Sequence, residues 1–318
     1  MTIECGAQSE GDRRAWLIAR DADGAEIDRI QVTGPDAGTN GMQSGVEMGD
    51  GELKEMWHAS RTREEVSLVG VAGATPGADQ VEVRRWMMRL ITKATDDTPW
   101  EDVERRLWRL TTPDRIGRHT GFFVIHYRER NGRGREITVK RTGTPKPESS
   151  TYAGQRGYEA WTFEVTAYDP WWYGEDEVDR WEAVGSGDHT LRVRNPGDQL
   201  GFLRYIIPAS DADVYWTVPD GLGVYPAGHP KAGQRIRHRL PLVQAGQIAE
   251  AHQRPDRLPF RILGVPMSFG LMRQARFTNP IEPGGELVDL PVTLETNAPN
   301  AGQAIEVRLT PAYDRPHS

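Results

Sequence analysis

The sequence contains a single cysteine, Cys5, among its 318 residues. One cysteine can neither form a disulfide within the chain nor supply the cysteine clusters of structural zinc sites. No run of 18 or more apolar residues occurs, so we expect no membrane-spanning helix. The first ten residues have no basic region followed by an apolar one, which predicts that no secretory signal is present. These features favour synthesis in a reducing cytoplasm.

The sequence also lacks the motifs that commonly carry catalysis or nucleotide binding. Its eight histidines form no HExxH pair, and there is no Gly-x-Ser-x-Gly elbow and no P-loop. Carboxylates are numerous, so composition alone leaves a glycosidase pair open. Nothing in the pattern singles out two of them, however. The sequence therefore predicts a protein that is not an enzyme, with no catalytic, cofactor-binding or metal-binding residues and no cofactor.

The charge is unevenly distributed. The formal net charge is -7, but residues 81–141 hold 15 Lys and Arg against 9 Asp and Glu, a local +6. A nucleic-acid-binding protein normally has a stronger basic field, so we expect no sequence-specific nucleic-acid partner. The Arg-rich turn, Arg128–Arg135, is typical of a solvated tip or of a contact with an acidic neighbouring subunit; phosphate contact is the alternative.

With 34 glycines and 22 prolines among many strand-like segments, the chain is predicted to be β-rich. Ala15–Arg20 and Ile27–Val32 form a hairpin around Asp21-Ala22-Asp23-Gly24, because Asp-Gly supplies the positive φ angles of a tight turn. The Asp-x-Asp-Gly run also suggests calcium. A calcium loop needs Glu at its twelfth position, where this sequence has Val32, so the turn is favoured.

Further along the first half, the glycine-rich segment Gly34–Gly51 is predicted to be a long loop. A strand is expected at Glu65–Gly73. Apolar residues between Ala78 and Ala94 recur every three to four positions, which predicts a helix. A second short helix is expected near Thr98-Pro99-Trp100-Glu101, with Thr98 as the N-cap.

Two more features complete the first half. Phe122–Arg128 and Arg135–Arg141 are predicted to form a hairpin across Asn131-Gly132. Tyr158–Tyr168 is predicted to be the last strand, with four apolar residues on one face: Trp161, Phe163, Val165 and Ala167.

The second half is predicted to be a β-sandwich, because short strands alternate with Asn-Pro-Gly, Pro-Asp-Gly and Pro-Gly-Gly turns. The expected strands are Thr190–Val193, Val214–Val218, Arg235–Leu240, Arg261–Val265, Leu287–Val292 and Ile305–Leu309. Nine of the ten tryptophans lie at or before Trp181. This change in composition, with the acidic stretch Gly174–Arg180 as a linker or as the first edge of a domain, predicts a boundary near residues 175–185.

An aromatic segment precedes this boundary: Tyr168-Asp169-Pro170-Trp171-Trp172-Tyr173-Gly174. It could stack on sugars, stack on nucleic-acid bases, or pack at a structural junction. Because it follows a core strand directly, we favour packing between two domains or subunits. Pro170 has no N–H and is expected to stop that strand at the edge of its sheet. The predicted structural or interface residues are Asp169, Pro170, Trp171, Trp172, Tyr173 and Gly174.

This segment resembles the end of the N-terminal domain in distal tail proteins of long-tailed bacteriophages, often labelled minor tail proteins in phages of actinobacteria. Three more stretches are similar to that family: Asn195–Asp198, Phe277–Gly285 and Val307–Tyr313. Glu282 stands where the family usually has proline. The resemblance covers most of residues 120–318, whereas Pro76–Thr112 matches no motif.

The resemblance implies a mainly β fold with a small α+β part. Residues 1–178 would be a ring-forming β domain with one or two helices, and residues 179–318 a galectin-like β-sandwich. The implied protein is a homohexameric ring at the distal end of a long non-contractile tail, located in the virion. Its implied partners are the tail tube protein, the baseplate hub or tail-associated protein, the tape measure protein and peripheral receptor-binding proteins. The alternative is a carbohydrate-binding module for host cell-wall glycans, for which Trp216 is the stacking candidate.

Overall fold

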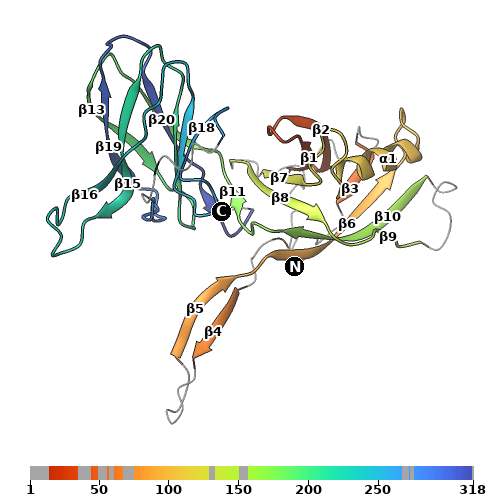
Figure 1. Cartoon of the computed structure of the whole chain (residues 1–318). Helices are drawn as coiled ribbons and strands as arrows, with labels where there is room; N and C mark the ends of the chain where they lie inside the picture. Colours follow the sequence, from red (N-terminus) through yellow and green to blue (C-terminus); the bar gives the residue numbers. More distant parts are fainter. Residues whose placement is uncertain are drawn as a thin grey trace, which may run out of the picture. The chain divides into compact units, whose positions relative to one another are not determined.

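The computed structural model describes residues 14–34, 44–48, 56, 61–66, 75–128, 133–149, 157–266, 272 and 276–316. The chain divides into two compact units, a first unit of Met1–Tyr173 with Asp314–Ser318 and a second unit of Gly174–Tyr313. Both are built mainly from strands (Figure 1), so the mainly β fold class is confirmed. Within the described residues, no helix combines the length and the apolar character that crossing a membrane requires.

Eleven strands of the first unit are described. They are β1 (Arg14–Arg20), β2 (Glu26–Thr33), β3 (Val46–Met48), β4 (Arg61–Val66), β5 (Thr75–Val81), β6 (Arg84–Lys93), β7 (Phe123–Arg128), β8 (Arg135–Arg141), β9 (Lys146–Pro147), β10 (Tyr158–Ala167) and β11 (Trp172–Tyr173). The main sheet has the order β2-β1-β7-β8-β10-β6-β3, with β9 beside β10 and β11 beside β8 (Figure 1). The β4 and β5 strands pair with each other in a separate sheet.

The predicted hairpin at the start of this unit is confirmed as β1 and β2. Its turn is held by Asp21, whose Oδ1 accepts hydrogen bonds from the backbone N–H groups of Asp23 and Ala25. Gly24 has φ of +85°, a conformation that glycine adopts without steric cost. The predicted β7–β8 hairpin and the strand at β10 are also present.

The helix predicted for Ala78–Ala94 is wrong, because the chain there forms β5 and β6. Burial along β6 alternates: Arg84, Trp86, Met88, Leu90 and Thr92 are all buried. This is the two-residue period of a strand. Apolar residues also lie on the opposite face of β6, where Met87 is exposed. Apolar positions on both faces produced the spurious helical spacing.

The second predicted helix is present as α1 (Trp100–Leu110), but Pro99 is its N-cap and no side chain caps it. Thr98 was therefore predicted one residue too early. The buried face of α1 consists of Trp100, Val103, Leu107 and Leu110. Its spacing of three and four residues is that of an amphipathic helix. Trp100 Nε1 donates to Thr92 Oγ1 at 3.0 Å and ties α1 to β6.

Two other expectations need correction where the structure describes them. The long loop predicted for Gly34–Gly51 contains β3, whose Val46 and Met48 are buried beside β6. The strand predicted for Glu65–Gly73 overlaps β4 only at residues 65–66. The remainder of that prediction, residues 67–73, lies outside the described residues.

The second unit contains two sheets of antiparallel strands. The strands are β12 (Glu177–Glu182), β13 (Gly187–Arg194), β14 (Leu203–Ile207), β15 (Val214–Val224), β16 (Arg235–Arg239), β17 (Ala249–His252), β18 (Phe260–Ile262), β19 (Leu287–Thr296), β20 (Ala304–Leu309) and β21 (Ala312–Tyr313). One sheet has the order β12-β20-β14-β17-β18, and the other has the order β13-β19-β15-β16. All six predicted strand regions contain a strand. The strands β12, β14, β17 and β21 were not predicted, and β21 belongs to neither of these two sheets.

One apolar core is shared by these two sheets, as the β-sandwich prediction requires. Trp216 of β15 and Phe260 of β18 are fully buried within it. Tyr205 of β14 is also buried, and its hydroxyl donates across the core to the Pro219 carbonyl of β15 at 3.0 Å. Trp181 packs edge-on against Trp216, with ring centroids 5.6 Å apart. The predicted orientation of Trp216, opposite to that of Tyr215, is present.

We predict that Trp216→Ala lowers the free energy of unfolding by about 3–5 kcal/mol, because it removes a fully buried ring and leaves a cavity. Urea unfolding followed by far-UV circular dichroism measures the change. Leu287→Ala is the control, since the Leu287 side chain is 68% exposed, and it should have little effect. Equal losses for the two variants would contradict this account of the core.

Candidate functional site

The aromatic segment lies between β10 and β11 in the first unit. Tyr168 is exposed, Trp171 and Tyr173 are half-buried, and Trp172 is fully buried. The Tyr173 hydroxyl donates to Asp169 Oδ2 at 2.7 Å, which closes the turn between the two strands. The predicted residues thus have different surroundings and do not form one exposed aromatic platform.

Pro170 does not end β10 in the way predicted. The strand stops at Ala167, before Pro170, and it pairs with both β6 and β8. Because β10 is an interior strand, its end is set by the bend at residues 168–169 and not by the edge of a sheet. Pro170 lies in the turn and is half-buried.

Trp172 is held by a polar contact as well as by packing. Its Nε1 donates to the Met56 carbonyl at 3.3 Å, and the same carbonyl accepts a hydrogen bond from Arg84 Nη1. Arg84 is also buried, and its Nη2 donates to the Asp314 carbonyl at 3.0 Å. Burial lowers the pKa of Arg84 to about 10 even though the Asp314 carboxylate opposes this shift. One carbonyl therefore joins the aromatic segment to β6.

Gly174, the last predicted residue, begins the second unit. Its N–H donates to the Pro311 carbonyl at 2.9 Å. A Cβ at this position would lie 3.1 Å from a ring atom of Tyr313 and 3.3 Å from Pro311 Cγ, so glycine permits the close approach. The predicted motif at residues 307–313 therefore contacts the residue that ends the aromatic motif.

Asn195 connects two further predicted motifs in the second unit. Its buried side chain donates from Nδ2 to the carbonyls of Gln199 and Ile281, and its Oδ1 accepts from the Gly197 N–H at 3.1 Å. Its own carbonyl accepts from the Gly285 N–H at 2.9 Å. The Asn-Pro-Gly-Asp turn and the Phe277–Gly285 segment, far apart in the sequence, are thus held together.

The Phe277–Gly285 segment is also fixed by Asp220. The Asp220 carboxylate is buried and accepts hydrogen bonds from backbone and side-chain groups of Thr278 and Asn279, and from Gln253 Nε2. Burial would raise the pKa of Asp220, but the imidazole of His238 and these donors hold it well below its ordinary value. At Gly221, a Cβ would overlap the Asn279 carbonyl oxygen at 1.9 Å, and φ is +53°. Glycine is required here.

Asp220 was missed because Pro219-Asp220-Gly221 was expected to be a turn. These residues instead lie inside β15, next to an irregular register with β16. The resemblance of residues 277–285 to a known family was the available signal. That resemblance pointed to the donors Thr278 and Asn279 but not to Asp220, which accepts their hydrogen bonds.

A second buried carboxylate, Glu250, lies on β17. Arg204 and Arg261 donate hydrogen bonds to it, and His252 Nε2 lies 3.2 Å from Glu250 Oε2. Burial alone would raise the pKa of Glu250, but the two guanidinium groups outweigh burial and lower it from 4.5 to about 2. In the first unit, Glu136 is similarly lowered to about 2, where hydrogen bonds from His126 and Arg20 outweigh burial.

Histidines among the described residues also form hydrogen bonds within the fold. His119 Nδ1 accepts from the Gly121 N–H at 3.0 Å, and its Nε2 lies 2.9 Å from the Leu110 carbonyl oxygen. Among the described residues, no group of three or more His, Cys, Asp or Glu side chains is placed to hold a metal ion. His58 and His317 lie outside the described residues.

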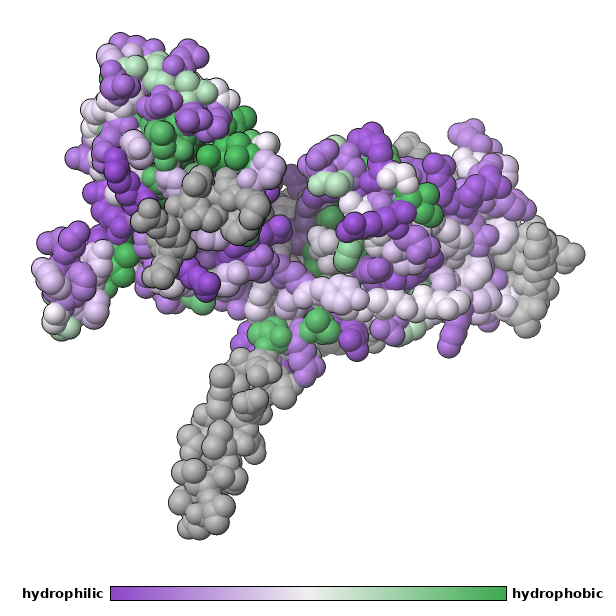
Figure 2. Space-filling model, in the orientation of Figure 1, coloured by the Kyte–Doolittle hydropathy of each residue, from purple (hydrophilic) through white to green (hydrophobic). Residues whose placement is uncertain are grey.

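Trp216 cannot be the exposed stacking residue that the carbohydrate-binding alternative needs, because it is fully buried. Trp181, which was not considered for that role, stacks on His189 with ring centroids 4.9 Å apart. Apolar surface of the second unit instead gathers over β18 (Figure 2). The exposed apolar residues in this part of the chain are Ile248, Leu258, Leu263 and Val265.

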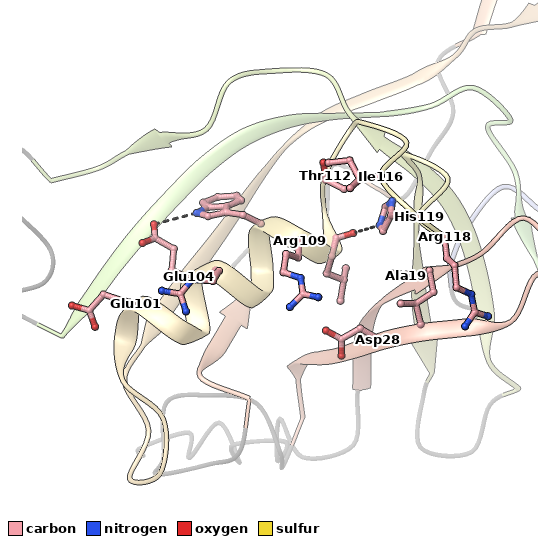
Figure 3. A pocket seen from close by; sticks show the side chains of 13 residues that line it. Ala19, Asp28, Glu101, Glu104, Arg109, Thr112, Ile116, Arg118 and His119 are labelled. Atoms are coloured by element: carbon pink, nitrogen blue, oxygen red, sulfur yellow. Dashed lines mark hydrogen bonds between the residues drawn. The ribbon is translucent and has the colours of Figure 1, made fainter.

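The first unit has a groove of about 900 Å³ between α1, the loop after it and the β1–β2 hairpin (Figure 3). Glu101 and Glu104 line the part beside the first half of α1, whereas Arg109 and Arg118 line the other part. Sequence reasoning did not identify this groove, because its lining comes from three separate segments.

Comparisons with known proteins were made for the whole chain. No family model matches it, and no curated protein sequence matches it. Among solved structures, the SPP1 Dit (gp 19.1) protein, described as a paradigm of the hub adsorption apparatus in phages infecting Gram-positive hosts, is similar. Its TM-score is 0.48 at 13% identity, over 84% of this chain and 98% of that chain.

A chain of the phage p2 baseplate in its activated conformation has a TM-score of 0.49 at 10% identity, over 94% of this chain and 98% of that chain. A chain of infectious bursal disease virus, Gx strain, has a TM-score of only 0.20 at 10% identity, over 94% of this chain and 67% of that chain. The first of these three chains is thus a phage Dit protein and the second is part of a phage baseplate.

We predict that Trp172→Ala lowers the free energy of unfolding of the first unit by about 3–5 kcal/mol, because it empties a buried site. Trp171→Ala should cost much less, since Trp171 is half-buried. Thermal unfolding by calorimetry resolves the two. A larger loss for Trp171→Ala would contradict the assignment of Trp172 as the packed residue.

A pH dependence follows from Glu250. Because folding lowers its pKa from 4.5 to about 2, the ionised carboxylate stabilises the fold above pH 4.5, and this contribution is lost as the pH falls towards 2. Glu250→Gln should therefore flatten the decline of the melting temperature in this window. Glu182→Gln, whose side chain is 75% exposed, should leave the decline unchanged. An unaltered profile for Glu250→Gln would show that the carboxylate contributes nothing.

Proposed function

We propose that this chain is a structural protein of a phage tail tip, forming a hexameric ring at the distal end of a long non-contractile tail. In this proposal the ring joins the tail tube to the baseplate hub or tail-associated protein, and the tape measure protein passes through it. The first unit makes the ring, and the second unit is a galectin-like sandwich that holds peripheral receptor-binding proteins. The protein would be made in the host cytoplasm and located in the virion.

The proposal rests on one observation: residues of the four family-like motifs form hydrogen bonds within the protein, to one another and to Asp220. Asn195 bonds to Ile281, and Asp220 bonds to Thr278 and Asn279. The aromatic motif continues into Gly174, which bonds to Pro311. These residues satisfy one another inside the protein and expose no reactive group, as expected when motifs preserve a scaffold. The two phage neighbours agree with this class of protein.

The ring should be visible directly. Light scattering should give a species near six times 35.7 kDa, and negative-stain images should show rings with an axial hole. Because such rings can require the tube as a template, immunogold labelling of purified virions is the companion measurement, and label should collect at the tail tip. A monomer in solution together with unlabelled tail tips would overturn the proposal.

A further inference from the structure

The charges of α1 and of the loops on either side of it are divided between two halves of the segment 96–118. Residues 96–104 contain five carboxylates and no Lys or Arg, whereas residues 105–118 contain five Arg and a single carboxylate, Asp114. The acidic residues of the first half are Asp96, Asp97, Glu101, Asp102 and Glu104, and the basic residues of the second half are Arg105, Arg106, Arg109, Arg115 and Arg118. Such a segment is complementary in charge to a second copy of itself that runs in the opposite direction.

The helix dipole accounts for only part of this order. It favours carboxylates in the first turn of a helix and cations in the last turn, which covers Glu101 and Arg109 of α1. Asp96 and Asp97 lie before the helix and Arg115 lies beyond its end, and all three are exposed. The division of charge therefore extends past the two helix ends, where the dipole gives no reason for it.

One stripe of α1 carries both signs of charge into the groove of the first unit. Glu101, Glu104, Arg105, Trp108 and Arg109 line the groove, and their spacing of three and four residues places them on one face of the helix. The two glutamates lie along the first half of α1, and Arg109 lies towards its end (Figure 3). Because Glu101, Arg105 and Arg109 are exposed, this stripe is accessible to a partner.

Both halves of the stripe contain charges without a partner in the part of the chain that the structure describes. No cation contacts Glu101 or Glu104 there, and no carboxylate contacts Arg109. Glu104 accepts a hydrogen bond from Trp108 Nε1 at 3.2 Å, but burial and the charges of Glu159 and Glu101 together raise its pKa. A partly buried carboxylate among like charges gains from a cation that is brought to it.

Neighbouring arginines of α1 are already paired within the chain. Arg105 contacts Asp102, and Arg106 Nη2 lies 2.7 Å from Asp28 Oδ1. These guanidinium groups therefore do not neutralise the glutamates of the stripe. The charges that are left for a partner are acidic in the first half of α1 and basic at its end.

We infer that α1 of one copy packs antiparallel against α1 of a second copy about a two-fold axis, so that each helix lies along the groove of the other copy. In the register that places Glu104 of each copy opposite Arg109 of the other, two ion pairs form, and a guanidinium can pair with a carboxylate through two hydrogen bonds. The same register brings Asp96 and Asp97 of each copy towards Arg115 of the other.

The groove also has apolar area that such a helix would cover. Ile27 is 42% exposed and Ile116 is 64% exposed, and both line the groove. Single exposed apolar residues are common on protein surfaces. These two, however, belong to one concave surface beside the basic half of the stripe, where the start of the second α1 would lie.

A two-fold contact joins the same surface of two copies and closes on itself. It can pair two free chains or two rings, but it cannot build a ring. The inference therefore goes beyond the proposed function and does not depend on it.

Crosslinking of one position to itself tests the two-fold contact. The variant carries Cys5→Ser and Arg105→Cys, which places its one cysteine beside the inferred axis at a side chain that is 68% exposed. Packed helices lie about 8–10 Å apart, so a short bismaleimide should join two such chains. The control carries Cys5→Ser and Leu287→Cys on the second unit, where the side chain is also 68% exposed, and should give only background crosslinking.

Charge reversals in the Arg105→Cys chain test the register. Glu104→Arg alone and Arg109→Glu alone each place like charges together twice, so each should lower the crosslinked fraction about tenfold at low salt. The double variant, Glu104→Arg with Arg109→Glu, should restore crosslinking because the exchange preserves both ion pairs. A mixture of the two single variants, one of them carrying an affinity tag, should give crosslinked pairs of one tagged and one untagged chain.

A surface control and a stability control accompany these variants. Glu182→Arg on the second unit, at a side chain that is 75% exposed, should leave the crosslinked fraction unchanged. Melting temperatures that match the parent show that a loss of crosslinking reflects the contact and not unfolding. Because Arg109 is exposed, Arg109→Glu tests the register even where Glu104→Arg lowers the melting temperature.

The outcomes separate this inference from the proposed function. Rings in negative stain, together with Arg105→Cys crosslinking no higher than that of Leu287→Cys, overturn the contact and leave the proposed function standing. Specific crosslinking by a protein that forms no rings and leaves tail tips unlabelled supports the contact and overturns the proposed function. Background crosslinking with neither rings nor labelled tips overturns both. Crosslinking that the single reversals do not lower, or that the double variant does not restore, shows that Glu104 and Arg109 do not face each other and also overturns the inference.

Discussion

The second unit depends on the burial of one carboxylate. Asp220 is almost fully buried. Burying a carboxylate without hydrogen-bond donors would cost more free energy than the net stability of a typical domain. Thr278, Asn279 and Gln253 provide the donors. The strand β15 and the segment that bears these donors must therefore fold together. Without its partner, each of them would bury polar groups that have no hydrogen bond. Asn195 extends the same dependence to the turn after β13.

In the first unit, a backbone carbonyl satisfies buried hydrogen-bond donors. Met56 accepts from both Trp172 and Arg84, so an aromatic ring and a buried guanidinium are positioned by one oxygen atom. Arg84 in turn donates to Asp314 near the end of the chain. Polar atoms in both units thus connect segments that are distant in the sequence. This use of Asn, Asp, Arg and Trp is structural, because these side chains satisfy polar groups that the fold buries.

Local sequence patterns predicted the elements whose neighbours in space are also neighbours in the chain. The β1–β2 and β7–β8 hairpins carry turn residues between alternating strands, and α1 carries one apolar face. In β6, apolar residues lie on both faces, so its period could not be identified from the sequence. The strands β12, β14 and β17 are short and contain charged residues. Their pairing with distant strands supplies the order that local propensity does not.

The candidate sites show the same limit, because burial and pairing emerge only in three dimensions. The sequence predicted a solvated tip or a contact with an acidic neighbouring subunit for the Arg-rich turn; this stays a prediction, because residues 129–132 lie outside the described residues. In the structure, the carboxylates differ in whether a cationic side chain contacts them. Glu136 and Glu250 have guanidinium groups beside them and pKa values of about 2, so their charge is used within the fold. Glu104 has burial and like charges without a contacting cation among the described residues, and its pKa is raised. Folding therefore disfavours the ionised form of Glu104, whereas it favours the ionised forms of Glu136 and Glu250.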